Sequence, residues 1–507
     1  MKSQKKIGVL LSYLNLALSM VTNIFLTPMI ITALGDESYS IYKVMQSFAG
    51  PLIMFNLGVS TIVTRAVVKY QTLEQHNLKE KQNTLALAML TSAVMAAVVA
   101  AAGAVMCGLI PTVYGKNYSP EQLNTGKVIF VVFVASTIFH ILTDAFTGCV
   151  IGHERFAFNS AMPLLKSLLR FALIIAAIQL NFGAVALAVI DCAVAVLVFA
   201  LSAGYALFGL KERPRLTYIN KRELLEMLSF SVAILLQAVV NQVNTNVDTM
   251  ILGAMIPQKQ IITMYSSALT IYSTYNSLVS VMSSFFLPKA TRLVTKNATG
   301  EQLTDFVIAP GRYQAVIAVA VVLGFALFGK DFIAVWIGPQ YSQAYYVTLM
   351  LIVPVTIPLV ENTAISILDA TLKRIFRSVV LVIMAAINVA VSIALVYFMG
   401  FWGAAIGTVL SILVGHVWLM NWYYKKTFKM NIGRLFQEIF RGILPMGLAA
   451  ALVCLPAALW FKAGVPGLIL KILLFVTVYG ALLWRWGLQG GEKANFSSLL
   501  RRFKRQR

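Results

Sequence analysis

Two basic side chains stand inside an apolar stretch of the sequence, where a buried charge is costly. Lys166 and Arg170 are four residues apart, so on a helix they share one face. A charged side chain at membrane depth generally faces a cavity or a partner rather than lipid. Two neighbouring cations suit a diphosphate or carboxylate ligand, and we predict an anion site here. A structural ion pair with Asp144 or Asp191 is the alternative.

Polar side chains, most of them amides or hydroxyls, form two stripes in helical register. The first, in the apolar run 224–254, consists of Gln237, Asn241, Asn244 and Asp248. The second, in the run 7–33, consists of Ser12, Asn15, Ser19 and Asn23. Because such groups are costly to expose to lipid, we predict that the stripes face each other across a hydrated cavity. The alternative is hydrogen bonding between helices that only holds the bundle together.

Acidic and aromatic side chains supply two further candidate sites. Asp248 and Glu361 lie in apolar runs and are candidates for binding a coupling proton or sodium ion, with a structural role as the alternative. Tyr272 and Asn276 are one helical turn apart. An aromatic face beside an amide suits a sugar, which needs a flat apolar contact and directional hydrogen bonds.

The elements that position these residues must be membrane helices. Of the 507 residues, 59% are hydrophobic and only 12% are charged, with a mean hydropathy of +0.80. A membrane-spanning helix needs about 20 apolar residues. We predict an all-helical polytopic membrane protein with about fourteen spans. These spans are 7–33, 41–64, 84–110, 124–149, 157–180, 183–208, 224–254, 262–287, 311–335, 343–367, 376–398, 401–424, 436–461 and 465–486.

The distribution of charge supports this topology. The net charge is +22, and most Lys and Arg residues fall in alternate connections between the spans. Cytoplasmic loops collect these residues, so we predict that both termini are cytoplasmic and that nucleic acid is not a partner. The basic tail 501–507 is explained by an anchor on anionic lipid headgroups, or alternatively by a docking segment.

An internal repeat divides the chain. Phe182-Gly183-Ala184 matches Trp402-Gly403-Ala404, and Leu34-Gly35 matches Leu252-Gly253. The first six and the next six spans therefore resemble two copies of one unit, an arrangement typical of transporters. We predict an N-terminal lobe at 1–210, a C-terminal lobe at 211–430 and two appended helices with the basic tail at 431–507.

Signatures of enzymes, cofactor sites and metal sites are missing from the sequence. The four cysteines form no CxxC pair, which argues against a zinc site or a disulfide framework. Gly324–Asp331 resembles a phosphate-binding loop, but it lacks the final Ser or Thr and ends a predicted membrane helix. We predict that the chain is not an enzyme and needs no cofactor.

Several short segments resemble a known family, the bacterial polysaccharide or O-antigen flippases. This family belongs to the superfamily that also contains multidrug exporters and the lipid II flippase. The similar segments are Leu34–Tyr42, Asn56-Leu57-Gly58 with Thr64-Arg65, Val247–Gly253 and Phe286-Leu287-Pro288. Ser40 stands where the family usually has Gly, and Asn56 stands where it often has an acid.

The resemblance implies alternating access by a two-lobed bundle in the bacterial cytoplasmic membrane. The implied substrate is an oligosaccharide joined through diphosphate to a polyprenyl lipid, moved to the outer leaflet for polysaccharide biosynthesis. Its diphosphate would bind Lys166 and Arg170, its sugars the two stripes, and Arg65 joins the candidate substrate-binding residues. The last two helices would border a groove for the lipid tail. Membrane lipids, a glycan polymerase and glycosyltransferases are the further partners that the resemblance allows.

Three other functions remain open from the sequence. A cation-coupled multidrug exporter would share the architecture and would bind cationic drugs instead of a lipid. A lipid II-type flippase should have a more strongly cationic cavity than the few buried charges here indicate. A scaffold protein that transports nothing would need its buried charges only for folding.

Overall fold

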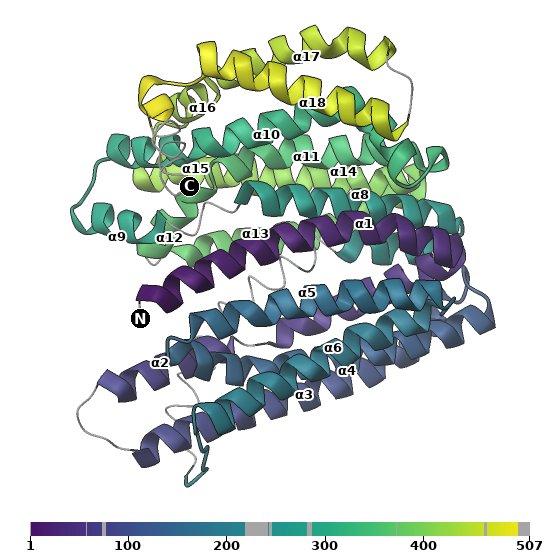
Figure 1. Cartoon of the computed structure of the whole chain (residues 1–507), viewed down its shortest axis with the longest axis vertical. Helices are drawn as coiled ribbons and strands as arrows, with labels where there is room; N and C mark the ends of the chain where they lie inside the picture. Colours follow the sequence, from purple (N-terminus) through teal and green to yellow (C-terminus); the bar gives the residue numbers. More distant parts are fainter. Residues whose placement is uncertain are drawn as a thin grey trace. The chain divides into compact units, whose positions relative to one another are not determined.

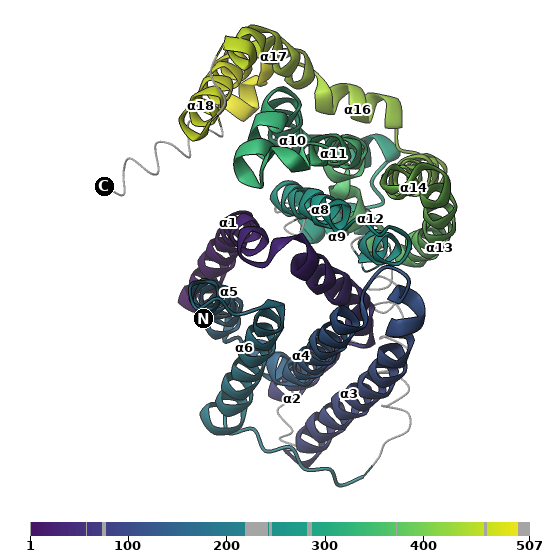
Figure 2. The ribbon, with the colours of Figure 1, turned by 90° about the vertical axis from the view of Figure 1, so that its right-hand side faces the viewer.

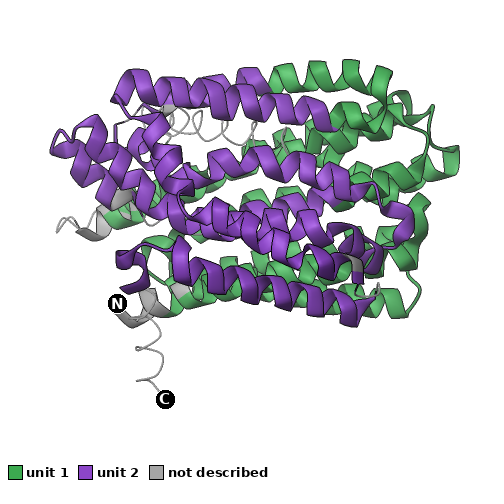
Figure 3. Ribbon diagram, turned by 90° about the horizontal axis from the view of Figure 1, so that it is seen from above, with its two compact units in different colours: residues 1–267, 385–404 green, residues 268–384, 405–507 purple. Residues whose placement is uncertain are grey.

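The computed structural model describes residues 2–56, 58–72, 78–218, 242, 246–280, 286–371, 373–460 and 464–494. Within these ranges the chain is helical without any strand, so the predicted all-helical class is confirmed. The chain packs as two compact units (Figure 3): unit 1 contains residues 1–267 and 385–404, and unit 2 contains residues 268–384 and 405–507. The division into repeat-based lobes at 1–210 and 211–430 stays a prediction about sequence symmetry.

Unit 1 is built mainly from the first six predicted spans. Its elements are α1 (Lys2–Ala49), η1 (Gly50–Phe55), α2 (Val59–Thr72), α3 (Leu78–Tyr114), α4 (Pro120–Gly152), α5 (Phe156–Gln179), α6 (Ala184–Gly204) and η2 (Tyr205–Gly209). Helix α1 packs along α5, while α4 contacts α2, α3 and α6; α3, α4 and α6 run alongside one another in Figure 1.

Two breaks shape the first part of unit 1. Gly35 interrupts α1 with a φ of 69°, in the left-handed region that glycine enters without steric cost. This kink separates the first two predicted spans. The second predicted span, 41–64, is not one helix as expected, because η1 interrupts it at Gly50-Pro51. A Gly-Pro pair is a strong signal for such a break.

A pair of glycines allows α2 to pack tightly on α4. A Cβ atom on Gly148 would lie 2.6 Å from the carbonyl oxygen of Ser60, and one on Gly152 would lie 2.6 Å from Cβ of Val67. The hydroxyl of Thr64 donates to the Gly148 carbonyl oxygen across the same contact. Small residues four positions apart are a common basis for close packing between membrane helices.

Unit 2 contains the remaining described helices, apart from those that cross the boundary between units. Its elements include α9 (Leu287–Thr295), α10 (Gly300–Trp336), α11 (Ala344–Val360), η5 (Asn362–Ala364), α12 (Ile365–Ala370), η6 (Ile412–Leu419), α15 (Met420–Phe428), α16 (Ile432–Phe440), α17 (Ile443–Trp460), α18 (Val465–Leu482) and η7 (Leu483–Gly487). Three helices span the boundary: α8 (Lys259–Ser280), α13 (Arg374–Met399) and α14 (Phe401–Ser411). Gly324–Asp331, the sequence similar to a phosphate-binding loop, lies inside α10.

The predicted number of spans is compatible with the structure but is not confirmed. The described part of the chain holds ten helices long and apolar enough to cross a membrane, or eleven if the bent pair α11 and α12 forms one span. One of the ten, Leu10–Arg65, covers the first two predicted spans. Most of the seventh predicted span, 224–254, lies outside the described residues.

A buried arginine fixes the last two helices to unit 2, where α17 and α18 lie together beside α10 (Figure 2). Arg312 of α10 is 2% exposed and donates from Nε and Nη2 to the carboxylate of Glu492 at 2.6 and 3.1 Å. Its other donated bonds reach the carbonyl oxygens of Glu438, Arg441 and Gly487. The five bonds tie α10 to both ends of the appended hairpin.

We expect Arg312→Gln to destabilise the protein by about 3–5 kcal/mol, because it leaves the Glu492 carboxylate buried without its cation. Thermal unfolding of the purified protein measures this loss. The matched control is Arg434→Gln. The side chains of Arg434 and Asp305 form an ion pair and are 42% and 57% exposed, so this pair should contribute under about 1 kcal/mol to stability. Equal losses for both variants would contradict the role of Arg312.

A second cluster of charged side chains lies in unit 1, near the connection between α4 and α5. The carboxylate of Glu212 accepts hydrogen bonds from Lys81 and from Nε2 of His153. Nearby, the side-chain oxygen of Asn83 accepts from the backbone N–H of both Thr217 and Tyr218. The segment after α6 is therefore held against the beginning of α3.

The Glu212 cluster predicts a dependence of stability on pH. Burial alone would raise the pKa of Glu212, but the hydrogen bonds and charges of His153 and Lys81 outweigh it and lower the pKa. A carboxyl whose pKa is lower in the folded protein stabilises the fold above its unfolded pKa of about 4.3, and loses this effect as the pH falls through the folded pKa.

The difference in unfolding temperature between the wild type and Glu212→Gln should therefore narrow as the pH falls from about 6 to about 3. Glu121→Gln serves as the control, because Glu121 is exposed at the start of α4. A difference that stays constant over this range would show that Glu212 is not ionised in the folded protein.

Candidate functional site

The two predicted cations of unit 1 have different partners. Nε of Arg170 lies 2.5 Å from Oδ1 of Asp191 on α6, so one predicted structural alternative, the pair with Asp191, is present. The Tyr42 hydroxyl donates to the other oxygen of Asp191 at 3.2 Å. Nζ of Lys166 instead lies 2.9 Å from Nε2 of His140 on α4.

This arrangement distributes charge unevenly between the two cations. Arg170 is balanced by Asp191, yet its guanidinium has five N–H groups and only Nε bonds to this carboxylate. Asp191 thus orients the arginine, and Tyr42, which donates to the same carboxylate, also contacts the guanidinium. Lys166 forms no salt bridge with any described residue, and its partner His140 accepts a hydrogen bond because an ammonium group can only donate. Lys166 is therefore not paired directly with a carboxylate, and the nearby acid, Asp191, is bonded to Arg170 and Tyr42.

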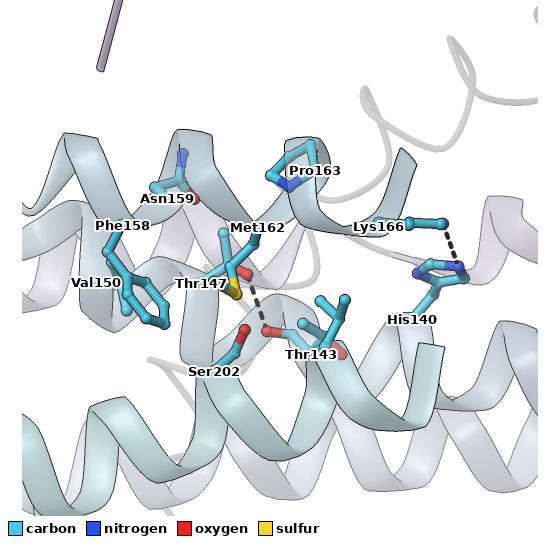
Figure 4. A pocket seen from close by; sticks show the side chains of 11 residues that line it. His140, Thr143, Thr147, Val150, Phe158, Asn159, Met162, Pro163, Lys166 and Ser202 are labelled. Atoms are coloured by element: carbon cyan, nitrogen blue, oxygen red, sulfur yellow. Dashed lines mark hydrogen bonds between the residues drawn. The ribbon is translucent and has the colours of Figure 1, made fainter. Parts of the chain in front are cut away.

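Lys166 lines a cavity of about 270 Å³ inside unit 1, between α4, α5 and α6. Figure 4 shows Lys166 and His140 together at one end, with Phe158 and Asn159 toward the other. The complete lining is His140, Thr143, Thr147, Val150, Phe158, Asn159, Met162, Pro163, Lys166, Val198 and Ser202. Lys166 lies about 15 Å along α5 from its first residue, at 1.5 Å per residue, and therefore well within the span.

The polar stripe of α1 bonds largely to α5. The hydroxyl of Ser167 donates to Oδ1 of Asn15 at 3.1 Å, and Ser19 lies 3.2 Å from the same hydroxyl. Ser12 pairs with Ser160 in the same way. These three positions thus show the interhelical hydrogen bonding considered as the alternative. Asn23 is exposed.

The other predicted residues of this unit are placed as follows. Gln237, Asn241 and Asn244 lie outside the described residues, so the proposed facing of the two stripes stays a prediction. Asp248 is 4% exposed and accepts a hydrogen bond of 2.6 Å from the Tyr265 hydroxyl. Arg65 is exposed on α2. None of these contacts tests the substrate-binding and ion-coupling roles predicted for them.

Glu361 occupies a break in a membrane-spanning segment of unit 2. It lies between α11 and η5, where the direction of the chain changes by 46° between α11 and the helix formed by Asn362–Ala370. Its side chain is 3% exposed, and Nδ2 of Asn421 lies 3.3 Å from Oε1. The second carboxylate oxygen, Oε2, is buried without a hydrogen-bond partner among the described residues, as are Oδ1 of Asn421 and Oγ1 of Thr363.

Buried oxygens at a broken span are chemically suited to a proton or a small cation. Irregular backbone at membrane depth occurs where it lines a site or a cavity, and discontinuous helices often form coupling-ion sites in transporters. Pro354 and Pro358 precede the break and weaken the helix there, because proline removes a backbone donor. The geometry is therefore consistent with the ion-coupling role predicted for Glu361.

Tyr272 and Asn276 lie on α8, as the sequence predicts. Tyr272 is 8% exposed, and the Asn276 amide donates to its carbonyl oxygen at 3.1 Å. The neighbouring Tyr275 hydroxyl lies 2.6 Å from the Thr356 hydroxyl on α11. The sugar-binding role of Tyr272 and Asn276 stays a prediction.

An apolar groove of about 310 Å³ lies between α10 and α18, and α18 is one of the last two helices, which the resemblance implies would border a groove. Phe325, Phe328 and Phe332 line it from α10, and Phe475 lines it from α18. Beside it, Nζ of Lys471 lies 2.5 Å from Oδ2 of Asp331. The sequence contained a signal for this ion pair, because Lys471 is a single charge in an apolar run and such a charge requires a partner.

Comparison with known proteins gives a family and a fold. Residues 4–295 match the family model described as polysaccharide biosynthesis protein. A structure of the lipid II flippase MurJ in an inward closed conformation is similar with a TM-score of 0.72 and 13% identity, covering 94% of this chain and 97% of that chain. An inward-facing multidrug resistance MATE family transporter of the MOP superfamily has a TM-score of 0.65 and 15% identity, covering 82% and 99%. A search of curated proteins finds no match.

Proposed function

The chain belongs to the polysaccharide biosynthesis protein family and has the fold of membrane transporters; from this premise we propose that it is a flippase for lipid-linked oligosaccharides. Its substrate is an oligosaccharide joined through diphosphate to a polyprenyl lipid, which it moves across the bacterial cytoplasmic membrane by alternating access. Both termini are cytoplasmic in this proposal. Membrane lipids surround the protein, and a glycan polymerase or glycosyltransferases act with it.

The observation that carries the proposal is that Lys166 lines a cavity without a salt bridge to any described residue. A cation at membrane depth is retained only where it faces a partner or a ligand, and this one lines a cavity. A sugar diphosphate cannot cross about 30 Å of hydrocarbon without polar groups. In this proposal Lys166 and the guanidinium of Arg170 supply charge-assisted hydrogen bonds for the diphosphate.

The remaining parts of the substrate require different surroundings. Hydrogen-bonding side chains bind the sugars in this proposal, namely Asn15, Asn23, Arg65, Gln237, Asn241, Asn244, Tyr272 and Asn276. The aromatic groove between α10 and α18 accepts part of the polyprenyl tail, since a lipid chain needs an apolar surface along its path. Asp248 and Glu361 bind the ion that drives the cycle.

Native mass spectrometry of the purified protein tests the substrate class. A polyprenyl-diphosphate oligosaccharide should remain bound in preference to the same lipid with a monophosphate or without a sugar. Retention of a cationic dye, with none of the three lipids retained, would favour the multidrug exporter instead.

A further inference from the structure

The cavity of unit 1 has a polarity that changes along its length. Thr143, Thr147 and Val150 follow His140 along α4, and Phe158, Met162 and Lys166 follow one another along α5. From Phe158 to Lys166 the cavity extends about 12 Å along the helix. Its charged end is at Lys166, deep in the span, and its other end lies near the connection between α4 and α5 (Figure 4).

The charged end is suited to an anion. Among the described residues that line the cavity, none is acidic. The nearby carboxylate, Asp191, is already bonded to Arg170 and Tyr42. The ammonium group of Lys166 has three N–H donors, of which the structure uses one, on His140. Two donors thus remain for a phosphate oxygen.

The rest of the lining offers the two kinds of contact that a sugar ring uses. Phe158 is stacked on Tyr205 with ring centroids 4.0 Å apart, and with Met162 and Val198 it supplies flat or apolar surface. The hydroxyls of Thr143 and Thr147 donate to backbone carbonyl oxygens of α4, which leaves their lone pairs to accept from a ligand.

Two further groups of the lining are available for hydrogen bonds. The amide of Asn159 and the hydroxyl of Ser202 both line the cavity, and neither side chain is bonded to a described residue. The volume of about 270 Å³ lies just below the range of about 300–1,000 Å³ that holds drug-sized ligands. It is therefore suited to one sugar residue with its phosphate and not to a whole oligosaccharide.

We propose that this cavity binds a sugar phosphate, with the phosphate at Lys166 and the ring beside Phe158, Asn159 and Ser202. The inference rests on the proposed function, in which the ligand is the sugar that is joined directly to the diphosphate. In this orientation the sugar lies toward the end of the helices and the phosphate lies deeper. The lipid tail then leaves from the phosphate into the hydrocarbon.

Saturation-transfer NMR with the protein in nanodiscs tests the proposal. The probes are glucose 1-phosphate and glucose, followed by their ring protons, and inorganic phosphate, followed by its ³¹P signal, each titrated separately. We expect glucose 1-phosphate to bind at least about 10-fold more tightly than glucose, as expected for a charge-assisted contact, with saturation of its ring protons. Lys166→Gln should remove this preference, while Lys116→Gln, at an exposed lysine in the connection before α4, should retain it.

A second variant distinguishes a loss of ligand binding from a loss of folding. Ser202→Val fills part of the cavity without removing a charge, so it should weaken glucose 1-phosphate binding while the unfolding temperature stays near that of the wild type. Equal binding of glucose and glucose 1-phosphate would overturn the proposal. Broadening of the ³¹P signals of glucose 1-phosphate and inorganic phosphate without any saturation of ring protons would also overturn it, because only a phosphate site would then exist.

The same preparations distinguish this inference from the proposed function. Lipid-linked oligosaccharide transport in proteoliposomes, with no sugar phosphate binding, would overturn the cavity assignment and leave the flippase proposal standing. Sugar phosphate binding that depends on Lys166, without such transport, would support the cavity assignment and contradict the flippase proposal.

Discussion

The double variant R170Q/D191N is expected to fold normally and to transport a diphosphate-linked oligosaccharide about 10- to 100-fold more slowly than the wild type. A hydrogen bond to a charged group contributes about 1.5–3 kcal/mol, and the variant removes such a bond to the substrate. Arg170 and Asp191 form an ion pair of 2.5 Å in the native protein. Replacing both residues avoids leaving one charged member of this pair without its partner. The single variant Arg170→Gln lacks this safeguard, because it leaves the Asp191 carboxylate unpaired.

Initial transport rates in proteoliposomes measure this effect, with the amount of folded protein normalised by thermal unfolding. Wild-type transport by R170Q/D191N would assign Arg170 a purely structural role. Lys166 would then be the only one of the two cations that binds the diphosphate. A loss of transport in the double variant at normal stability is the result that the account requires.

Replacing Glu361 with Gln is expected to abolish the stimulation of transport by an ion gradient while substrate exchange without a gradient continues. The amide keeps the shape of the carboxyl and its contact with Asn421, but it cannot bind a proton or supply charge for a cation. The expected ratio of rates with and without a gradient is therefore about one, because only a group whose ion binding differs between states transmits the gradient.

The gradient experiment uses imposed proton and sodium gradients in separate vesicle preparations. Glu301→Gln is the matched control, since Glu301 is exposed at the first turn of α10 and should leave the stimulation unchanged. A Glu361→Gln variant with unchanged stimulation would leave Asp248 as the candidate that binds the coupling ion. A variant without exchange in either condition would indicate that Glu361 is needed for the structure of the broken span.

Much of the fold follows from local sequence. Apolar runs of the right length predict the helices, and Gly35 predicts the first kink because few other residues adopt its backbone conformation. The Gly50-Pro51 pair is also a local signal for a break, but the continuous hydropathy of the run 41–64 led to the prediction of a single span. The break at Glu361 had a signal in Pro354 and Pro358, yet neither proline fixes where the helix resumes.

The candidate site was predictable in its charges but not in its contacts. The spacing of Lys166 and Arg170 placed both on one face of α5, and the cost of burial required partners for them. Which acid pairs with Arg170 depends on how α6 packs, and the sequence left Asp144 and Asp191 open. In the structure, Asp144 instead accepts from the backbone N–H of Ser60.

Contacts between residues far apart in the sequence could not be predicted from local sequence patterns. His140 meets Lys166 only because α4 and α5 fold back on each other, and Arg312 meets Glu492 across 180 positions of sequence. The cavity is lined from three helices, α4, α5 and α6, and hydrophobic periodicity does not predict how they pack. The polar side chains of α1 were visible in the sequence, but their hydrogen bonds to Ser160 and Ser167 depended on the packing of α5.

The most direct test of the central claim is a flipping assay in proteoliposomes with three cargoes. These are a fluorescent polyprenyl-diphosphate oligosaccharide, lipid II and a cationic dye, each scored for protein-dependent arrival at the opposite leaflet or lumen. The account predicts transport of the oligosaccharide lipid well above the other two cargoes, and its loss in R170Q/D191N. Transport of the dye alone, driven by a proton or sodium gradient, would contradict it and identify the chain as a drug exporter.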